Sequence, residues 1–186
     1  MNIGFAMCGS FCTYAEVFPV LEVLASVHTV IPIFSLASQT TDSRFGTAKE
    51  HIERAETICG RKILCTISDV EPIGPKQLLD ALIIAPCTGN TIAKLAHSIA
   101  DGPVTMAAKS HLRNGRPVLI AISSNDALAG AAENIGKLLN KKNYFFVPFG
   151  QDDPQKKPTS MVADFQKIPQ ALELALEGKQ MQPLLK

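Results

Sequence analysis

Short apolar runs alternate along the whole chain with longer stretches of helical periodicity. The apolar runs predict strands with the sequences NIGFAM, TVIPIF, KILCT, DALIIAP, GRPVLIAIS and NYFFVPF. Between them, apolar residues at helical spacing predict helices over 11–26, 47–60, 90–100, 103–113, 125–140 and 161–179. The inner strands are continuously apolar, which is typical of parallel strands covered on both faces. The pattern therefore predicts an α/β fold: a three-layer, Rossmann-like, doubly wound sheet, mostly parallel, with helices on both faces.

Prolines and glycines set expectations for several of these elements. Pro32 within TVIPIF predicts an edge strand or a bulge, because proline cannot donate to a central ladder. Pro19 predicts a kink or a second start in the first helix, and Gly60 predicts the end of the helix over 47–60. Since no repeat, low-complexity tract or linker interrupts the 186 residues, we expect a single domain, 1–186.

Composition narrows the classes of function. A hydrophobic content of 46% suffices for a core, and a net charge of +1 with no basic stripe argues against nucleic acid. The longest apolar runs are too short for a membrane span, and the start lacks the features of a signal peptide. The five cysteines show no CxxC spacing and predict reduced thiols in a cytoplasmic protein. No histidine or cysteine pair has metal-ligand spacing, so we expect no metal site.

Small polar residues follow every one of the main predicted strands. The segments are MCGSFCT, SLASQTTDSRFG, PCTGNT, SSND and PFGQDDP. Because the carboxyl ends of parallel strands meet at one edge of a sheet, these turns are expected to lie together. A single such turn is more often a helix cap than a ligand site. Five on one rim favour a bound anionic cofactor, although the turns alone do not identify it.

Two longer stretches carry a family resemblance. GFAMCGSFCTY resembles the glycine–serine turn of the flavin-binding, cysteine-decarboxylase-like flavoproteins, and APCTGNTIAKLAHSIAD resembles their central Pro-x-x-x-Asn-Thr motif with the helix after it. TTDSRFG, LRNGRP, SNDALAG, VPFGQDDPQKKPTSMVA and ALEGKQMQP are similar, in addition, to the family of bacterial dipicolinate synthase B subunits. The resemblance covers essentially the whole chain.

The resemblance implies FMN in a Rossmann-like fold, at contacts between the protomers of a trimer-based homo-oligomer. It implies that Gly9 and Ser10 meet the flavin phosphate, with Ser35 beside them. It also implies that further residues line the flavin and the substrate edge or close the pocket: Thr88, Asn90, Thr91, Ser123, Ser124 and Asn125. Asn90 and Asn125 are the candidate catalytic residues.

The chain departs from the decarboxylases of that superfamily at two places. Their catalytic histidine lies in the loop before the central strand, and here that loop reads SDVEPIGPKQLL. Of their Pro-x-Met-Asn-x-x-Met motif, only Asn125 is present in the segment 122–128. Decarboxylation of a cysteinyl substrate is therefore not expected.

As a member of the dipicolinate synthase B subunits, the chain would act with the A subunit of dipicolinate synthase during sporulation, in the mother cell of a spore-forming bacterium. The A subunit resembles a nicotinamide-binding dehydrogenase, so NAD(P) is expected on the partner. The pair would oxidise a dihydrodipicolinate-type ring to dipicolinate. The alternatives are a non-catalytic FMN- or phosphate-ligand-binding module that supports the A subunit, or a flavin-dependent decarboxylase.

A small dicarboxylate substrate would suit arginine and lysine side chains. The candidates are Arg44, Arg113, Arg116 and Lys157, with Arg44 foremost because it lies in a polar loop expected at the ligand rim. Cys87 lies beside a predicted helix start that could lower its pKa, although a packing role is favoured for a small thiol. His51 is expected to be exposed on its helix.

Overall fold

Five parallel strands form the centre of the sheet in the computed structural model, which describes all 186 residues. They are β1 (Asn2–Met7), β2 (Thr29–Phe34), β3 (Ala81–Cys87), β4 (Val118–Ser124) and β5 (Tyr144–Phe146), in the order β2-β1-β3-β4-β5. Two short strands, β7 (Met161–Ala163) and β6 (Phe149–Gly150), extend the end of β4 in antiparallel fashion. The predicted mostly parallel, Rossmann-like sheet is confirmed.

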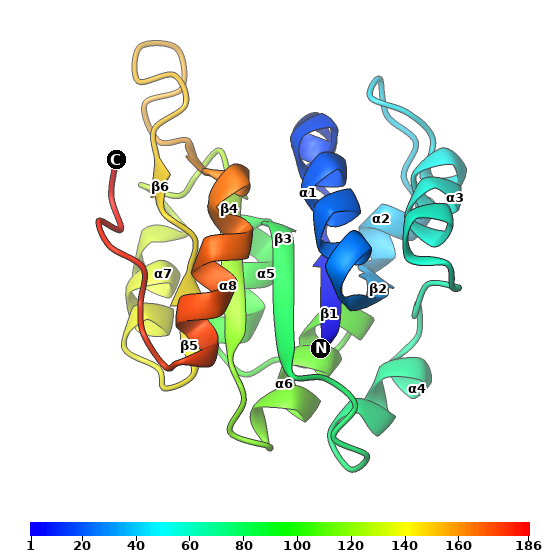
Figure 1. Cartoon of the computed structure of the whole chain (residues 1–186). Helices are drawn as coiled ribbons and strands as arrows, with labels where there is room; N and C mark the ends of the chain where they lie inside the picture. Colours follow the sequence, from blue (N-terminus) through cyan, green and yellow to red (C-terminus); the bar gives the residue numbers. More distant parts are fainter.

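Helices cover both faces of the sheet (Figure 1). One layer holds α1 (Tyr14–Val27) and α8 (Ile168–Leu176), with α3 (Ala48–Cys59) packed against α1. The opposite layer holds α5 (Gly89–Ala96), α6 (Pro103–Leu112) and α7 (Ala132–Leu139). The remaining short helices are α2 (Leu36–Thr40), α4 (Ile67–Val70) and the 3-10 turns η1 (Phe11–Thr13), η2 (Glu71–Ile73) and η3 (Phe165–Lys167).

Local sequence explains the best-predicted elements. Every residue of β3 is buried, as its unbroken apolar run indicated. The pairing register between β3 and β4 shifts between Ile84 and Cys87. Pro86, which has no N–H to donate, lies at this irregularity, and the strand continues beyond it to Cys87. The helix α3 begins with a Thr47–Glu50 capping box and ends at Gly60, whose φ of 63° is left-handed. Pro32 lies in β2, which is an edge strand as predicted.

Other predicted elements were wrong in detail. The run at 62–66 forms no strand, and only Leu64 makes an isolated bridge to Ile33. The predicted helix over 161–179 instead begins with β7, and its helical part starts at Ile168, with Pro169 in the first turn. Residues 125–131 are turns rather than the start of α7. The helix α1 continues through Pro19 without a second start.

The order of the strands determines where a ligand can bind. The chain leaves β1 into α1 on one face and leaves β3 into α5 and α6 on the other. The two connections diverge above neighbouring strands, which opens a crevice at the carboxyl ends of β1 and β3. The fold thus provides a ligand site at the edge where the polar turns were expected.

Two of the four histidines are buried. His51 is 7% exposed and packs against the rings of Tyr14, Phe18 and Phe11, with centroid distances of 4.7, 6.0 and 6.4 Å. The expectation that His51 is exposed was therefore wrong, because the aromatic residues of α1 and its preceding turn cover it. His111 is fully buried, and its Nε2 donates to the Pro117 carbonyl at 3.1 Å while its Nδ1 has no partner.

The burial of His111 predicts a loss of stability in acid. Burial lowers the pKa of His111 from 6.5 to about 4. As pH falls from 6.5 towards 4, the unfolded chain takes up a proton there that the folded chain does not, so the free energy of unfolding falls, by about 3 kcal/mol at most. Urea unfolding at several pH values should show a flatter pH dependence for His111→Gln than for the exposed His97→Gln. Equal slopes in the two variants would contradict this assignment.

Candidate functional site

The five polar turns do meet at one edge of the sheet. Two loops rise on either side of this edge, residues 41–47 on the α3 side and 150–160 on the β6 side (Figure 1). Two neighbouring cavities lie along this edge and share Gly9 and Thr88 in their walls. We call the pair the edge cleft. Its position at the carboxyl ends of the strands confirms the placement predicted from the sequence.

The first cavity of the edge cleft has a volume of about 400 Å³ and lies where helices begin. The starts of α5 and α6 both open onto it, and so do the end of β1 and the residues after β2. Backbone N–H groups in the first turn of a helix have no partner within the helix and carry partial positive charge. The one carboxylate in the wall, Asp101, is paired with Lys94 at 2.9 Å. The cavity is therefore suited to an anion.

The second cavity, of about 550 Å³, is formed by the turns after β1 and β4 and by both flanking loops. Phe11 and Phe45 contribute aromatic rings to its wall, and Val162 adds an apolar surface. Hydroxyl and amide groups come from Ser10, Ser123, Ser124 and Asn125, among others. A mixture of flat apolar and polar groups suits a ring with hydrogen-bonding edges.

A buried network of hydrogen bonds supports the floor of the edge cleft. The Tyr14 hydroxyl lies 3.1 Å from the Cys8 carbonyl and 3.0 Å from the Ser38 hydroxyl. Ser38 in turn donates to the Met7 carbonyl at 3.0 Å. These contacts fasten α1 and α2 to the end of β1, so the backbone of the β1 turn is held in place beneath the cleft.

Side-chain contacts also join the turns to one another. Ser10, after β1, lies 2.7 Å from the hydroxyl of Ser123 at the end of β4. Thr91, in the first turn of α5, donates to the sulfur of Cys8 at 3.3 Å. The polar turns that the sequence places far apart thus form one connected rim.

Two glycines allow the rim to pack closely. A Cβ on Gly9 would lie 3.3 Å from the Ala37 Cβ and 3.6 Å from the Phe11 ring. A Cβ on Gly89 would lie 2.6 Å from a carboxylate oxygen of Asp126. Because Gly9 lies in the wall of both cavities, its missing side chain leaves the backbone open to a ligand.

The predicted cofactor-binding and catalytic residues all line the edge cleft. Gly9, Ser35, Thr88, Asn90 and Thr91 lie in the wall of the first cavity. The second cavity has in its wall Gly9, Ser10, Thr88, Ser123, Ser124 and Asn125. The carboxamides of Asn90 and Asn125 make no hydrogen bond within the chain, whereas those of Asn114 and Asn140 do. The two candidate catalytic residues therefore present free amide groups.

The four predicted substrate-binding cations separate into two groups. Lys157 lines the second cavity and pairs with Asp152 at 3.1 Å. Arg44 is exposed in the flanking loop 41–47 and lies over the ring of Phe45, 4.8 Å from its centroid. Arg113 and Arg116 lie at the other end of the sheet, because α6 runs antiparallel to the strands and β4 begins after them. Neither of these two reaches the edge cleft.

Arg116 makes structural contacts, and its removal should destabilise the fold. Its guanidinium donates to the carbonyls of Leu79 and Gln77 and lies 3.8 Å from Asp80. Hydrogen bonds from a charged donor contribute roughly 1.5–3 kcal/mol, so Arg116→Leu should lower the free energy of unfolding by about 2 kcal/mol. Urea unfolding measures this change, with the exposed Arg61→Leu as the control. An Arg116→Leu protein of unchanged stability would contradict the structural role.

Two buried cysteines remain protonated: Cys8, in the wall of the first cavity, and Cys87, which lines neither cavity. Burial raises the pKa of Cys87 well above its usual range and that of Cys8 to about 11. Burial therefore outweighs the expected effect of a helix start on Cys87, and a packing role holds for both thiols.

The sequence also missed part of the cleft, namely the start of α6 at 102–105, since no strand directly precedes it. The chain contains no group of three or more His, Cys, Asp or Glu residues that could hold a metal ion. None of its helices combines the length and the apolar character that a membrane span requires.

Comparison with known proteins agrees with this architecture. The Flavoprotein family model matches residues 1–172. The chain is 46% identical over 185 residues to the B subunit of dipicolinate synthase from Bacillus subtilis strain 168, covering 99% of this chain and 92% of that protein. The crystal structure of the dipicolinate synthase B subunit from Bacillus halodurans is 45% identical, with a TM-score of 0.91 over 100% of this chain and 95% of that one.

More distant structures share the fold. The FMN-dependent cysteine decarboxylase SpaF has a TM-score of 0.70 at 22% identity, covering 94% of this chain and 97% of that one. DmrB of Burkholderia xenovorans, solved in complex with FMN, has a TM-score of 0.70 at 16% identity, covering 95% of each chain.

The chain belongs to the Flavoprotein family, as the family model over residues 1–172 shows. The similarity to dipicolinate synthase B subunits that was read from the sequence is confirmed as well.

Proposed function

We propose that the edge cleft binds FMN and that the chain is the flavin-binding component of a two-component dipicolinate synthase. The observation that carries the proposal is the first cavity, where the starts of α5 and α6 and the open backbone of Gly9 surround one volume. Helix starts of this kind are suited to a phosphate group. The resemblance of the whole chain to dipicolinate synthase B subunits supports the particular activity.

The residues present fit FMN in size and chemistry. The two cavities, about 400 and 550 Å³, are each of the size of a small-molecule site. Gly9, Ser10 and Ser35 would hold the phosphate end. The second cavity would take the flavin ring against Phe11 or Phe45, with Ser123 and Ser124 closing the pocket.

FMN, when bound, supplies a two-electron acceptor. The chain's own residues would bind and orient the substrate beside it. The free amides of Asn90 and Asn125 can hold polar edges of the substrate, and the hydroxyls of Thr88 and Thr91 line the same wall. Lys157, in the wall of the second cavity, and Arg44, in the flanking loop, would meet substrate carboxylates at the rim.

The proposed reaction converts a dihydrodipicolinate-type ring into dipicolinate. The ring loses two hydrogens, as a hydride and a proton, and becomes aromatic. The A subunit of the synthase would carry NAD(P) and take the electrons onward, in the cytoplasm of the mother cell of a spore-forming bacterium. A trimer-based homo-oligomer of this chain would complete the flavin site.

A second candidate is a binding module that holds FMN or another phosphate ligand for the A subunit and carries out no chemistry. The favouring observation is that no histidine lines either cavity of the edge cleft. The free groups in the wall are mostly amides and hydroxyls, which orient ligands but do not exchange protons near neutral pH.

Reconstitution separates the two candidates. One sample of the purified chain would be heated to detect any released flavin. Another would be mixed with the A subunit and a dihydrodipicolinate source, with and without its flavin, while dipicolinate formation is followed. A catalytic role predicts flavin release and product formation that requires flavin on this chain. Product formation that is unchanged after flavin removal would favour the module, and a chain that neither binds flavin nor stimulates the A subunit would contradict both.

A further inference from the structure

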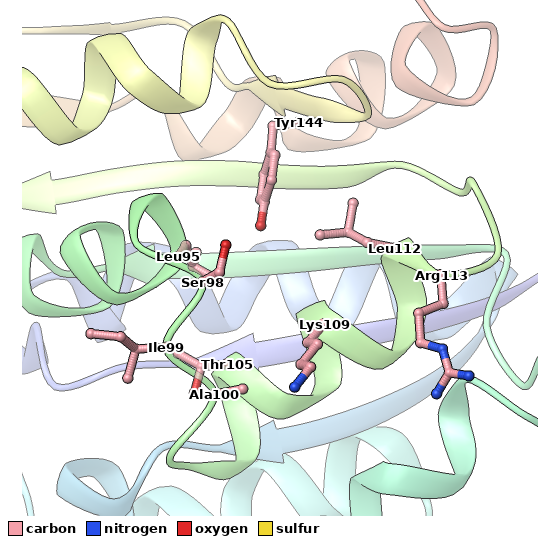
Figure 2. Close-up of a pocket in the computed structure, with 9 residues that line it drawn as sticks. All are labelled: Leu95, Ser98, Ile99, Ala100, Thr105, Lys109, Leu112, Arg113 and Tyr144. Atoms are coloured by element: carbon pink, nitrogen blue, oxygen red, sulfur yellow. The ribbon is translucent and has the colours of Figure 1, made fainter.

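A third cavity lies outside the edge cleft, on the α6 face of the sheet. It has a volume of about 420 Å³, and we call it the α6 cavity. Its wall comes from the end of α5, the outer side of α6 and the start of β5 (Figure 2). The lining residues are Leu95, Ser98, Ile99, Ala100, Thr105, Lys109, Leu112, Arg113 and Tyr144. None of the residues proposed to bind FMN is among them.

Four polar side chains of the α6 cavity have no partner within the chain: Lys109, Arg113, Ser98 and Tyr144. The hydroxyl of Thr105, in contrast, is bonded to the backbone of Gly102. Lys109, on α6, and Arg113, the C-cap of that helix, lie one helical turn apart and form no ion pair, although nine ion pairs occur elsewhere in the chain. The phenol of Tyr144 makes no hydrogen bond within the chain. In Figure 2 its hydroxyl and that of Ser98 both point toward the middle of the cavity.

The charge of the cavity wall has one sign. No aspartate or glutamate contributes to it, and its two charged side chains are both cations. Side chains at positions i and i+4 on a helix have Cβ atoms about 5–6 Å apart, so Lys109 and Arg113 border the same cavity. Their charged groups lie on the side away from the Tyr144 hydroxyl (Figure 2). The wall is therefore complementary to a small molecule with one or two negative charges.

Most of the remaining wall is apolar. Leu95, Ala100 and Leu112 supply apolar surface, and so does Ile99, which has 47% of its surface exposed. The body of Tyr144 adds an aromatic surface, and burial raises the pKa of its phenol to about 12, which keeps it a hydrogen-bond donor. An apolar wall with charge at one side suits a flat ring that carries carboxylates.

We propose that the α6 cavity is a second small-molecule site, which binds an aromatic ring bearing one or two carboxylates. Lys109 and Arg113 pair with the carboxylates, Tyr144 and Ser98 donate hydrogen bonds, and the leucines contact the ring. The site is separate from the edge cleft, although Thr105 at the start of α6 lines both. The inference does not depend on FMN binding or on the proposed reaction.

The two tyrosines of the chain, with no tryptophan present, allow a direct test. Tyr14 lies under the edge cleft, bonded to Cys8 and Ser38, whereas Tyr144 lies in the α6 cavity. Protein with ¹³C-labelled tyrosine rings would be titrated with pyridine-2,6-dicarboxylate and followed by NMR, with Tyr144→Phe used to assign the signals. We expect saturable movement of the Tyr144 signal, with or without a separate movement of the Tyr14 signal.

Matched variants decide the role of the cations. Lys109→Gln should weaken binding of pyridine-2,6-dicarboxylate about tenfold or more, as expected for loss of a charged hydrogen bond. Lys49→Gln, on the distant helix α3, should leave it unchanged, and neutral pyridine should bind far more weakly. Movement of the Tyr14 signal without movement of the Tyr144 signal would place the ligand in the edge cleft alone and overturn the proposal.

Equal affinities in the two variants, or no movement of either signal, would also overturn it. So would a Tyr144 signal that depends on protein concentration and not on ligand, because that result would assign the cavity to a contact between copies. A separate titration with FMN, read at Tyr14, tests the edge cleft independently. Failure of one site is therefore distinguishable from failure of the other.

Discussion

Replacing Gly9 by valine is expected to weaken FMN binding by about 100-fold or more while the fold is kept. Gly9 borders both cavities of the edge cleft, and its Cβ position lies 3.3 Å from the Ala37 Cβ. A branched side chain there would fill the space beside the helix starts and displace the phosphate from the backbone. Loss of two hydrogen bonds to a charged group corresponds to roughly 3 kcal/mol or more, which is about 100-fold in affinity.

Equilibrium dialysis with FMN measures the effect, and urea unfolding checks that the variant is folded. Gly136→Ala is a suitable control, because Gly136 lies on α7 with open space around its Cβ position. A folded Gly9→Val protein with the flavin affinity of the parent would remove Gly9 from the binding site.

Replacing Asn90 by alanine is expected to lower the rate of dipicolinate formation in the reconstituted enzyme by about 100-fold. The Asn90 carboxamide lies in the first turn of α5, lines the first cavity and has no partner within the chain. Removal of a single positioned hydrogen-bond donor from an active site reduces kcat by roughly 100-fold or more. Flavin affinity should change by less than about tenfold, since one neutral hydrogen bond contributes only about 1 kcal/mol.

Initial rates over a range of substrate concentrations, with bound flavin measured in the same samples, test this expectation. Asn134→Ala is the matched control, because Asn134 lies on α7 and bonds to His97 outside the cleft. A fall in rate that matched the loss of bound flavin would assign Asn90 to cofactor binding alone. An unchanged rate with full flavin occupancy would exclude it from both roles.

The architecture of the sheet could be predicted because burial dominates its strands. Each residue of DALIIAP from Ala81 onward is buried in β3, and so is most of VLIAISS in β4. Strands buried on both faces leave a continuous apolar run that no amphipathic helix of that length would show. The end of α3 was equally predictable, because Gly60 acts within its own helix.

The short strands could not be predicted, because their partners are distant in sequence. Met161–Ala163 forms β7 only through pairing with the end of β4 and with β6. Its three residues carry no periodicity of their own, so the apolar pattern merged them with the helix that follows. The run at 62–66 shows the reverse case, where strand-like residues find only one bridging partner.

The edge cleft was predicted better than its charged surroundings. Residues at or just after the carboxyl end of a strand, such as Ser10, Thr88 and Ser123, are placed by topology alone. Arg113 and Arg116 precede β4, so the same topology places them at the amino ends of the strands, opposite the edge cleft. Their assignment to the substrate site rested on charge alone, which carries no such positional information.

The most direct test of the account compares the dissociation constants of FMN and riboflavin for the purified chain. The two ligands share the flavin ring and differ in the phosphate, which the helix starts and Gly9 are proposed to hold. We predict that FMN binds at least about 100-fold more tightly, and that the ratio shrinks as salt screens the phosphate. Equal binding of the two ligands, or binding of neither, would contradict the claim that this edge of the sheet is a phosphate-binding flavin site.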